Sequence, residues 1–85
     1  MEADHWKSIV ALAVGEELKH ESHRMTGFMQ EEDVDTYAIV GADGAKTGEV
    51  IVRDHTAVKG FRRSIRVTQV DIAGKQTLDT SYDVR

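Results

Sequence analysis

The sequence predicts an α+β fold in which an N-terminal helix packs on a four-stranded antiparallel β-meander. The first 24 residues carry apolar side chains at helical spacing, whereas residues 34–84 contain short runs rich in Val and Ile. Glycine-containing turn signals separate two pairs of these runs, as expected between antiparallel strands. Eighty-five residues are expected to form one domain, residues 1–85.

The N-terminal helix is expected over residues 4–24, with Asp4 as its N-cap. An apolar side chain recurs at every fourth position, as Trp6, Val10, Val14 and Leu18. Glu17 and Glu21 follow on the same face. We therefore expect the first four turns to lie on the sheet and the last turns to extend past its edge.

Residues 25–33 are expected to link the helix to the sheet. Thr26–Gly27 is a stop signal, and Glu31–Asp33 is an acidic run. Phe28 and Met29 are unusual in a linker. We expect them to fold back onto the end of a thin core; the alternative is an exposed apolar patch that binds a partner.

The first two strands are expected over residues 34–41 and 48–54, joined by a two-residue turn at Asp43–Gly44. This turn sets Tyr37 opposite Val50 and Ile39 opposite Gly48. Arg53 then points away from the core.

The longest β-like run covers residues 61–72. Its apolar residues change parity, from Phe61, Ile65 and Val67 at odd positions to Val70 and Ile72 at even ones. A bulge near Thr68–Gln69 would place both sets on one face. Arg62 and Arg66 then point outward.

The last strand is expected over residues 76–84. A three-residue loop, Ile72–Ala73–Gly74, would connect it to the preceding strand, with Gly74 in the left-handed conformation. This loop places Leu78 on the same face as Val70 and sets Asp71 opposite Lys75.

Charge is unevenly distributed along the chain, whose net charge is −4. Residues 1–35 hold nine acids and three bases, whereas residues 53–66 hold five bases and one acid. Two surfaces of opposite sign follow from this distribution. The acidic one comprises Glu16, Glu17, Glu21, Glu31, Glu32 and Asp33, and the basic one Arg53, Lys59, Arg62, Arg63 and Arg66.

The chain contains no Cys, no apolar run of transmembrane length, and acids rather than bases near its N-terminus. We therefore expect a cytoplasmic protein without membrane contact. A nucleophile paired with a base, a phosphate-binding glycine loop and a paired-carboxylate site are all missing from the sequence. We expect neither enzymatic activity nor a cofactor.

The leading hypothesis is a non-catalytic protein–protein interaction module, such as an adaptor, an inhibitor or an accessory factor. Its two charged surfaces would steer association with a protein partner or let two copies form a homodimer. The alternative is a nucleic-acid-binding accessory protein that uses Arg53, Arg62 and Arg66, although the pI of about 5.5 is low for that class.

A third hypothesis concerns metal binding at the end of the expected helix. Glu16, His20 and His23 fall at i, i+4 and i+7, which would place them near one helical face. Two imidazoles and one carboxylate do not complete a zinc site. No bound metal is therefore expected, and this helix end is at most metal-responsive.

Overall fold

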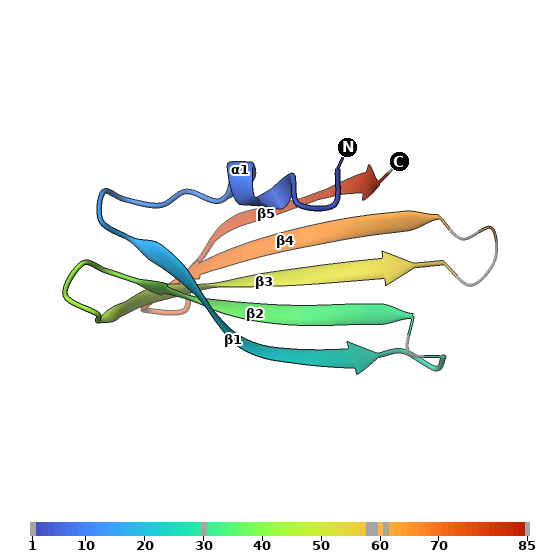
Figure 1. Ribbon diagram of the computed structural model, residues 1–85, viewed down its shortest axis with the longest axis horizontal. Coiled ribbons are helices and arrows are strands. Elements are labelled where there is room, and N and C mark those ends of the chain that lie inside the picture. Colours follow the sequence, from blue (N-terminus) through green and yellow to red (C-terminus); the bar gives the residue numbers. More distant parts are fainter. Residues whose placement is uncertain (1, 30, 58–59, 61, 85) are drawn as a thin grey trace.

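Five antiparallel strands form a single sheet, and an N-terminal segment crosses one of its faces (Figure 1). The computed structural model describes residues 2–29, 31–57, 60 and 62–84. Its elements are α1 (Trp6–Ile9), β1 (Glu17–Thr26), β2 (Glu32–Val40), β3 (Lys46–Thr56), β4 (Arg63–Asp71) and β5 (Gln76–Val84). Each strand pairs with the next along the chain, in the order β1-β2-β3-β4-β5. The antiparallel sheet is confirmed.

The predicted fold class, with a helix over residues 4–24 on four strands, is wrong. Helix α1 has only four residues, and Glu17–Thr26 forms a fifth strand. The helical conformation ends at Val10 (φ −64°, ψ 132°), and Gly15 has φ +84°, which is incompatible with a right-handed helix. A helix in a protein draws most of its stability from tertiary packing of its apolar face rather than from its own sequence. Pairing with β2 therefore overrides the helical spacing, and the expected linker becomes part of β1, a turn and the start of β2.

The N-terminal segment lies over the face of the sheet that we call the inner face. The buried cluster on this face consists of Trp6, Ile39, Val50, Val52, Ile65 and Val67. Trp6 is only 5% exposed, and its ring centroid lies 5.0 Å from that of Tyr37. An aromatic side chain of this size supplies a large share of the apolar area that so small a protein can bury. Trp6 thus covers the inner face, with Ala3 and Val10 of the same segment packed against the cluster.

Two polar side chains of the sheet hold this segment in place. The Gln69 amide bonds both backbone groups of Ala11: Oε1 accepts from the amide N–H (3.1 Å) and Nε2 donates to the carbonyl (2.8 Å). The Tyr82 hydroxyl accepts from the Trp6 amide (2.9 Å) and donates to the Ala3 carbonyl (3.0 Å). Gln69, 8% exposed, is thereby a buried polar residue with its hydrogen bonds made.

The bulge predicted near Thr68–Gln69 is wrong. β4 keeps its register with β3 from end to end, so its odd positions face inward through Gln69, and Val70 faces outward. The irregularity lies between β4 and β5, where Gln69 pairs with Leu78 and Val70 with Gln76, leaving Thr77 as the extra residue. Gln69 occupies the inward position because Ala11 satisfies its amide.

The β2–β3 and β4–β5 hairpins use the same three-residue turn. Gly44 N–H donates to the Gly41 carbonyl and Gly74 N–H to the Asp71 carbonyl, each at 2.9 Å, with φ of +83° and +85°. The loop ending at Gly74 is as predicted, but Leu78 and Val70 lie on opposite faces because Thr77 is an extra residue in β5. The turn at Gly44 is one residue longer than predicted, and the extra residue Thr47 in β3 compensates for it. The predicted partners of Ile39 and Tyr37, Gly48 and Val50, are therefore correct.

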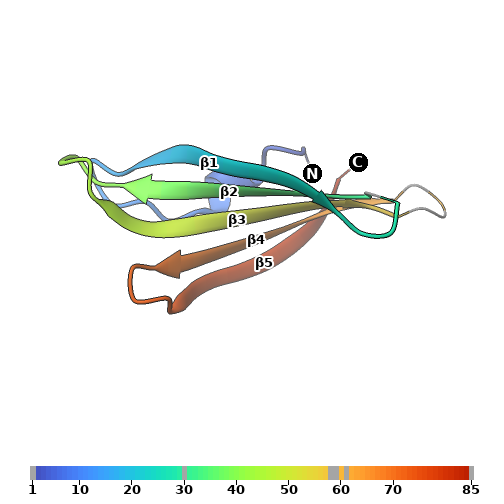
Figure 2. The same cartoon turned by 90° about the horizontal axis from the view of Figure 1, so that it is seen from below.

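The opposite face, the outer face, carries no layer in the described part of the chain. Figure 2 shows the twist of the sheet, and the molecule measures 45 × 24 × 19 Å. Among the described residues no helix is long and apolar enough to cross a membrane.

Candidate partner-binding site at the open end of the sheet

A β-bulge places two histidines on one face of β1. His20 pairs with Tyr37 and Ser22 with Thr36, so Glu21 is the extra residue between them. Residues three apart in a regular strand point to opposite faces. Because of the bulge, His20 and His23 both lie on the inner face. Bulges often re-aim side chains in this way at functional sites.

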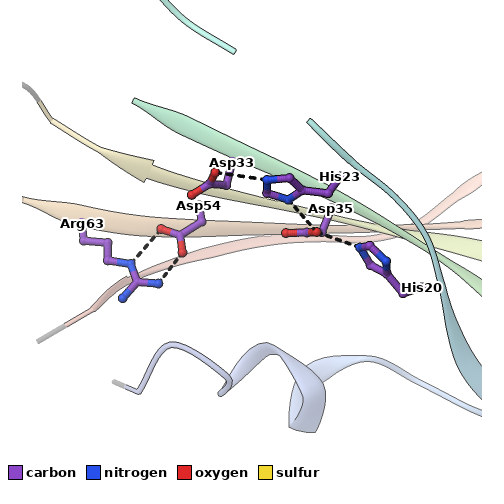
Figure 3. A network of polar contacts seen from close by, with 6 residues as sticks. All are labelled: His20, His23, Asp33, Asp35, Asp54 and Arg63. Atoms are coloured by element: carbon purple, nitrogen blue, oxygen red, sulfur yellow. Dashed lines mark hydrogen bonds and ion pairs between the residues drawn. The ribbon is translucent and has the colours of Figure 1, made fainter. Parts of the chain in front are cut away.

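Both imidazoles bind the same carboxylate oxygen. His20 Nε2 lies 2.8 Å and His23 Nδ1 2.9 Å from Asp35 Oδ1. Both contacts are drawn in Figure 3. Each hydrogen bond requires a proton on the nitrogen that faces Asp35, so the carboxylate sets both tautomers. Partial burial opposes the charge on Asp35, but the two imidazoles outweigh it and hold the pKa of Asp35 below its usual value.

Two further carboxylates lie beside Asp35. Asp33 precedes it by two residues on β2 and stands directly opposite Asp54 of β3. Asp54 is bound by the Arg63 guanidinium, with Nε 2.8 Å from Oδ1 and a second contact from the terminal nitrogen to Oδ2 (Figure 3). These hydrogen bonds raise the pKa of Arg63. We call Asp33, Asp35 and Asp54 the carboxylate cluster; Arg63 binds Asp54, and His23 Nε2 lies 3.5 Å from Asp33 Oδ1.

Apolar side chains project next to the carboxylate cluster. Met25 pairs with Asp33 across β1 and β2 and is 50% exposed. In the turn that follows, Phe28 is 99% and Met29 64% exposed. The expectation that Phe28 and Met29 fold back onto the core is therefore wrong. We call Met25, Phe28 and Met29 the apolar tip.

The turn itself explains why the apolar tip points outward. Gly27 has φ +91°, which redirects the chain at the end of β1. The Glu31 carboxylate then accepts the Met29 N–H at 2.9 Å. Hydrogen bonds from the backbone N–H of Glu31 itself and from that of Met29 lower the pKa of Glu31. The carboxylate closes the turn from inside, so Phe28 and Met29 are left on its solvent side.

The six acids of the predicted acidic surface do not form one surface. Glu16 lies in the turn before β1, where hydrogen bonds from Thr47 and Ala13 lower its pKa. Glu21 binds Lys46, and Glu32 binds Arg53. Glu17 is exposed at the start of β1. Only Glu31 and Asp33 lie at the apolar tip and the carboxylate cluster.

The proposed metal ligands are not brought together either. The helix that would have aligned Glu16, His20 and His23 does not form, and Glu16 bonds Ala13 and Thr47 instead. Across residues 2–29, 31–57, 60 and 62–84, no group of three or more His, Cys, Asp or Glu side chains has a geometry suited to a metal ion.

The predicted basic residues divide between the two faces of the sheet. Arg53 and Arg66 are direct neighbours on the outer face, as expected from their outward parity. Each is bound to a carboxylate, Arg53 to Glu32 at 3.0 Å and Arg66 to Asp79 at 2.7 Å. Arg63 lies on the inner face. Arg62 is exposed, and Lys59 lies outside the described residues.

A hollow of about 720 Å³ on the outer face contains both of these neighbouring arginines. Its walls also include Glu32, His55 and Asp83. Acids and bases therefore balance along this hollow, in contrast to the surplus of carboxylates on the inner face. An anionic ligand would have to displace the carboxylates that hold Arg53 and Arg66.

Sequence reasoning missed the members of the cluster that matter most, Asp35 and Asp54. One signal was available: Asp33 and Asp35 are two residues apart in a predicted strand region and so share a face. The contribution of His20 and His23 depends on the bulge at Glu21, which no glycine or turn residue marks.

No protein-family model, curated protein or solved structure matches this chain. A function can therefore be argued only from geometry, at the end of the sheet that carries the carboxylate cluster and the apolar tip. We call it the open end. Two features coincide there, a surplus of carboxylates and exposed large apolar side chains.

Proposed function

We propose that the protein is a non-catalytic protein–protein interaction module that binds its partner through the apolar tip and the carboxylate cluster. The observation that carries this proposal is the exposure of Phe28 and Met29 in the turn that follows Met25. Met25 is the strand partner of Asp33, which brings the apolar tip next to the carboxylate cluster. A contiguous patch of large apolar side chains that remains exposed to water marks an interaction site. An adaptor, an inhibitor or an accessory factor would each fit this description.

The two parts of the site would contribute differently to binding. Burying a side chain the size of Phe28 is worth roughly 1.5–3 kcal/mol, so the apolar tip supplies most of the affinity. Met side chains adapt their shape to a partner surface. The carboxylate cluster favours a partner that presents basic residues around an apolar pocket, and speeds its approach.

Site-specific photo-crosslinking in cells tests the proposal. A photoreactive phenylalanine analogue replaces Phe28 in one protein and Ile72 in a control. Ile72 is a suitable control because it is also apolar and 72% exposed, but lies in the hairpin turn between β4 and β5. We expect a discrete protein adduct from position 28 that is absent from position 72.

A second comparison separates binding from simple stickiness. The position-28 adduct should decrease when Asp33 is changed to Asn, because the cluster loses charge without losing shape. Equal labelling from both positions would contradict the proposal. Adducts with nucleic acid instead of protein, lost in an Arg53→Ala and Arg66→Ala variant, would favour the nucleic-acid alternative.

A further inference from the structure

The two edge strands of the sheet differ in how they are protected against pairing with another chain. β1 is interrupted by the bulge at Glu21, a common device for blocking an edge. β5 runs without irregularity from Leu78 to Val84. In the described part of the chain β5 has β4 as its strand neighbour, and no described strand pairs with its outer edge.

The side chains of β5 alternate cleanly between the two faces. Leu78, Tyr82 and Val84 pack partly against the inner-face core. Asp79 and Ser81 lie on the outer face and are exposed. Thr80 lies midway along the strand, between the apolar residues of the inner face. A strand of this kind is suited to extend a sheet by one more antiparallel neighbour.

We propose that the protein forms a symmetric homodimer in which β5 pairs antiparallel with β5 of a second copy, with the two-fold axis at Thr80. In this register Leu78 stands opposite Tyr82 of the second copy, and Asp79 stands opposite Ser81. The inner faces of both copies lie on the same side. The result is a continuous sheet with a self-complementary, isologous interface.

Charge selects this register over its two neighbours. Shifting the pairing one way places Asp79 opposite Asp83 of the second copy, and shifting it the other way places Asp79 opposite itself. Like charges directly opposite one another destabilise an antiparallel pair. The register centred on Thr80 avoids both arrangements. It also matches the apolar side chains Leu78 and Tyr82 on the inner face.

Cysteine crosslinking tests the register, because the natural chain has no cysteine. A Thr80→Cys variant would place two thiols directly opposite each other, within the range of a disulfide. Ser22→Cys, at the middle of β1, is the control and is the more exposed position. Under mild oxidation we expect a disulfide-linked dimer from Thr80→Cys and much less from Ser22→Cys. Equal crosslinking at both positions would overturn the proposal.

A charge series at Ser81 tests the interface without a new covalent bond. Ser81→Asp would place two carboxylates opposite each other twice, and should weaken the dimer roughly two- to thirty-fold. Ser81→Lys should tighten it, because the ammonium group faces Asp79 of the second copy. Ser81 pairs with Arg66 within the chain, so the aspartate faces a cation in β4, whereas the lysine faces a like charge there. The folded state of Ser81→Lys is therefore checked by melting before its association is measured.

Sedimentation velocity over a concentration series gives the dissociation constants. A circular dichroism melt confirms that each variant is folded. Opposite shifts for the two Ser81 variants support the pairing of β5 with β5. A natural chain that sediments as a monomer at every concentration, or two variants that shift together, would rule it out.

Discussion

Asp33 and Asp54 stand directly opposite each other on neighbouring strands of the inner face. Like charges in this position repel, and Arg63 offsets part of that repulsion through its paired hydrogen bonds to Asp54. The arrangement keeps negative charge at the open end of the sheet at some expense in stability. Such local conflict is typical of a surface that serves binding.

Removing one of the two charges should stabilise the protein. We expect Asp33→Asn to raise the free energy of unfolding by about 0.5 kcal/mol, because the cross-strand repulsion disappears. Arg63→Met should lower it by about 1 kcal/mol, a value reduced by the partial exposure of the pair. Urea denaturation measures both. The free energy lost in Arg63→Met should be smaller when Asp33 is already Asn, because Arg63 then has no Asp33 charge to offset. Strictly additive changes would contradict an interaction between Arg63 and Asp33.

The lowered pKa of Asp35 predicts a defined dependence of stability on pH. A carboxyl group with a lower pKa in the folded state stabilises the fold at pH above its unfolded pKa, which is about 3.9 for Asp. That contribution is lost as the pH falls through the lowered pKa. Asp35→Asn should therefore melt at a more constant temperature between about pH 2 and 5 than the natural chain. If the melting temperature changed equally with pH in both proteins, the role assigned to His20 and His23 would be contradicted.

The bulge at Glu21 should be removable without moving the histidines. Deleting Glu21 leaves His20 and His23 two residues apart, so a regular strand would still present both to Asp35. We expect the deletion to change the free energy of unfolding by less than about 1 kcal/mol, since it removes only the exposed ion pair with Lys46. His20 and His23 NMR signals that still shift when Asp35 is changed to Asn would support this prediction. A disordered β1 would show that the bulge is required.

The same deletion should have a second effect, on association. A straight β1 is a less protected edge than a bulged one. The Glu21-deleted protein should therefore aggregate faster than the natural chain in light-scattering assays. Unchanged solubility would mean that the charges on β1 protect the edge by themselves.

Gln69 should be essential for docking of the N-terminal segment. Gln69→Leu removes both hydrogen bonds to Ala11 and should cost about 1–3 kcal/mol. The indole of Trp6 should then become accessible to a fluorescence quencher. Gln76→Leu, the same replacement at an exposed position, is the matched control and should leave Trp6 protected. Equal quenching in both variants would contradict the prediction.

Phe28 should matter for binding and not for stability. Because its side chain is 99% exposed, Phe28→Ser should leave the free energy of unfolding within about 0.5 kcal/mol of the natural value. It should also abolish capture of the protein partner found by crosslinking at a neighbouring position such as Met29. A large loss of stability would mean that Phe28 packs on the fold in solution.

Several parts of the fold were accessible from the sequence because they depend on local chemistry. Asp-Gly and Ala-Gly steps marked the β2–β3 and β4–β5 hairpins, and Gly44 and Gly74 do take the left-handed conformation that their turns require. The strand predicted over residues 76–84 coincides with β5. The pairing of Tyr37 with Val50 was also correct, because alternation restricts the register wherever one face is buried.

The first 24 residues were misassigned because two structures compete for the same pattern. Apolar residues at four-residue steps fit a helix, yet Leu18 lies opposite Ile39 in a strand pair. A helix over residues 4–24 would depend on packing its apolar stripe, whereas the sheet offers β1 both a row of hydrogen bonds and a place beside Tyr37. This competition is settled by contacts distant in sequence, so local propensity misled the prediction.

The sequence by itself determined the position of the turns at Gly44 and Gly74, the strand alternation over residues 34–40 and 48–54 and the uneven charge of the chain. Only the tertiary structure decided that Gln69 faces inward, since its partner Ala11 lies 58 residues away. Only the tertiary structure decided, too, that His20 and His23 both bind Asp35, because the bulge at Glu21 turns both to the inner face. Turns and alternation follow from the stereochemistry of adjacent residues, whereas burial of a polar group depends on which distant partner satisfies it.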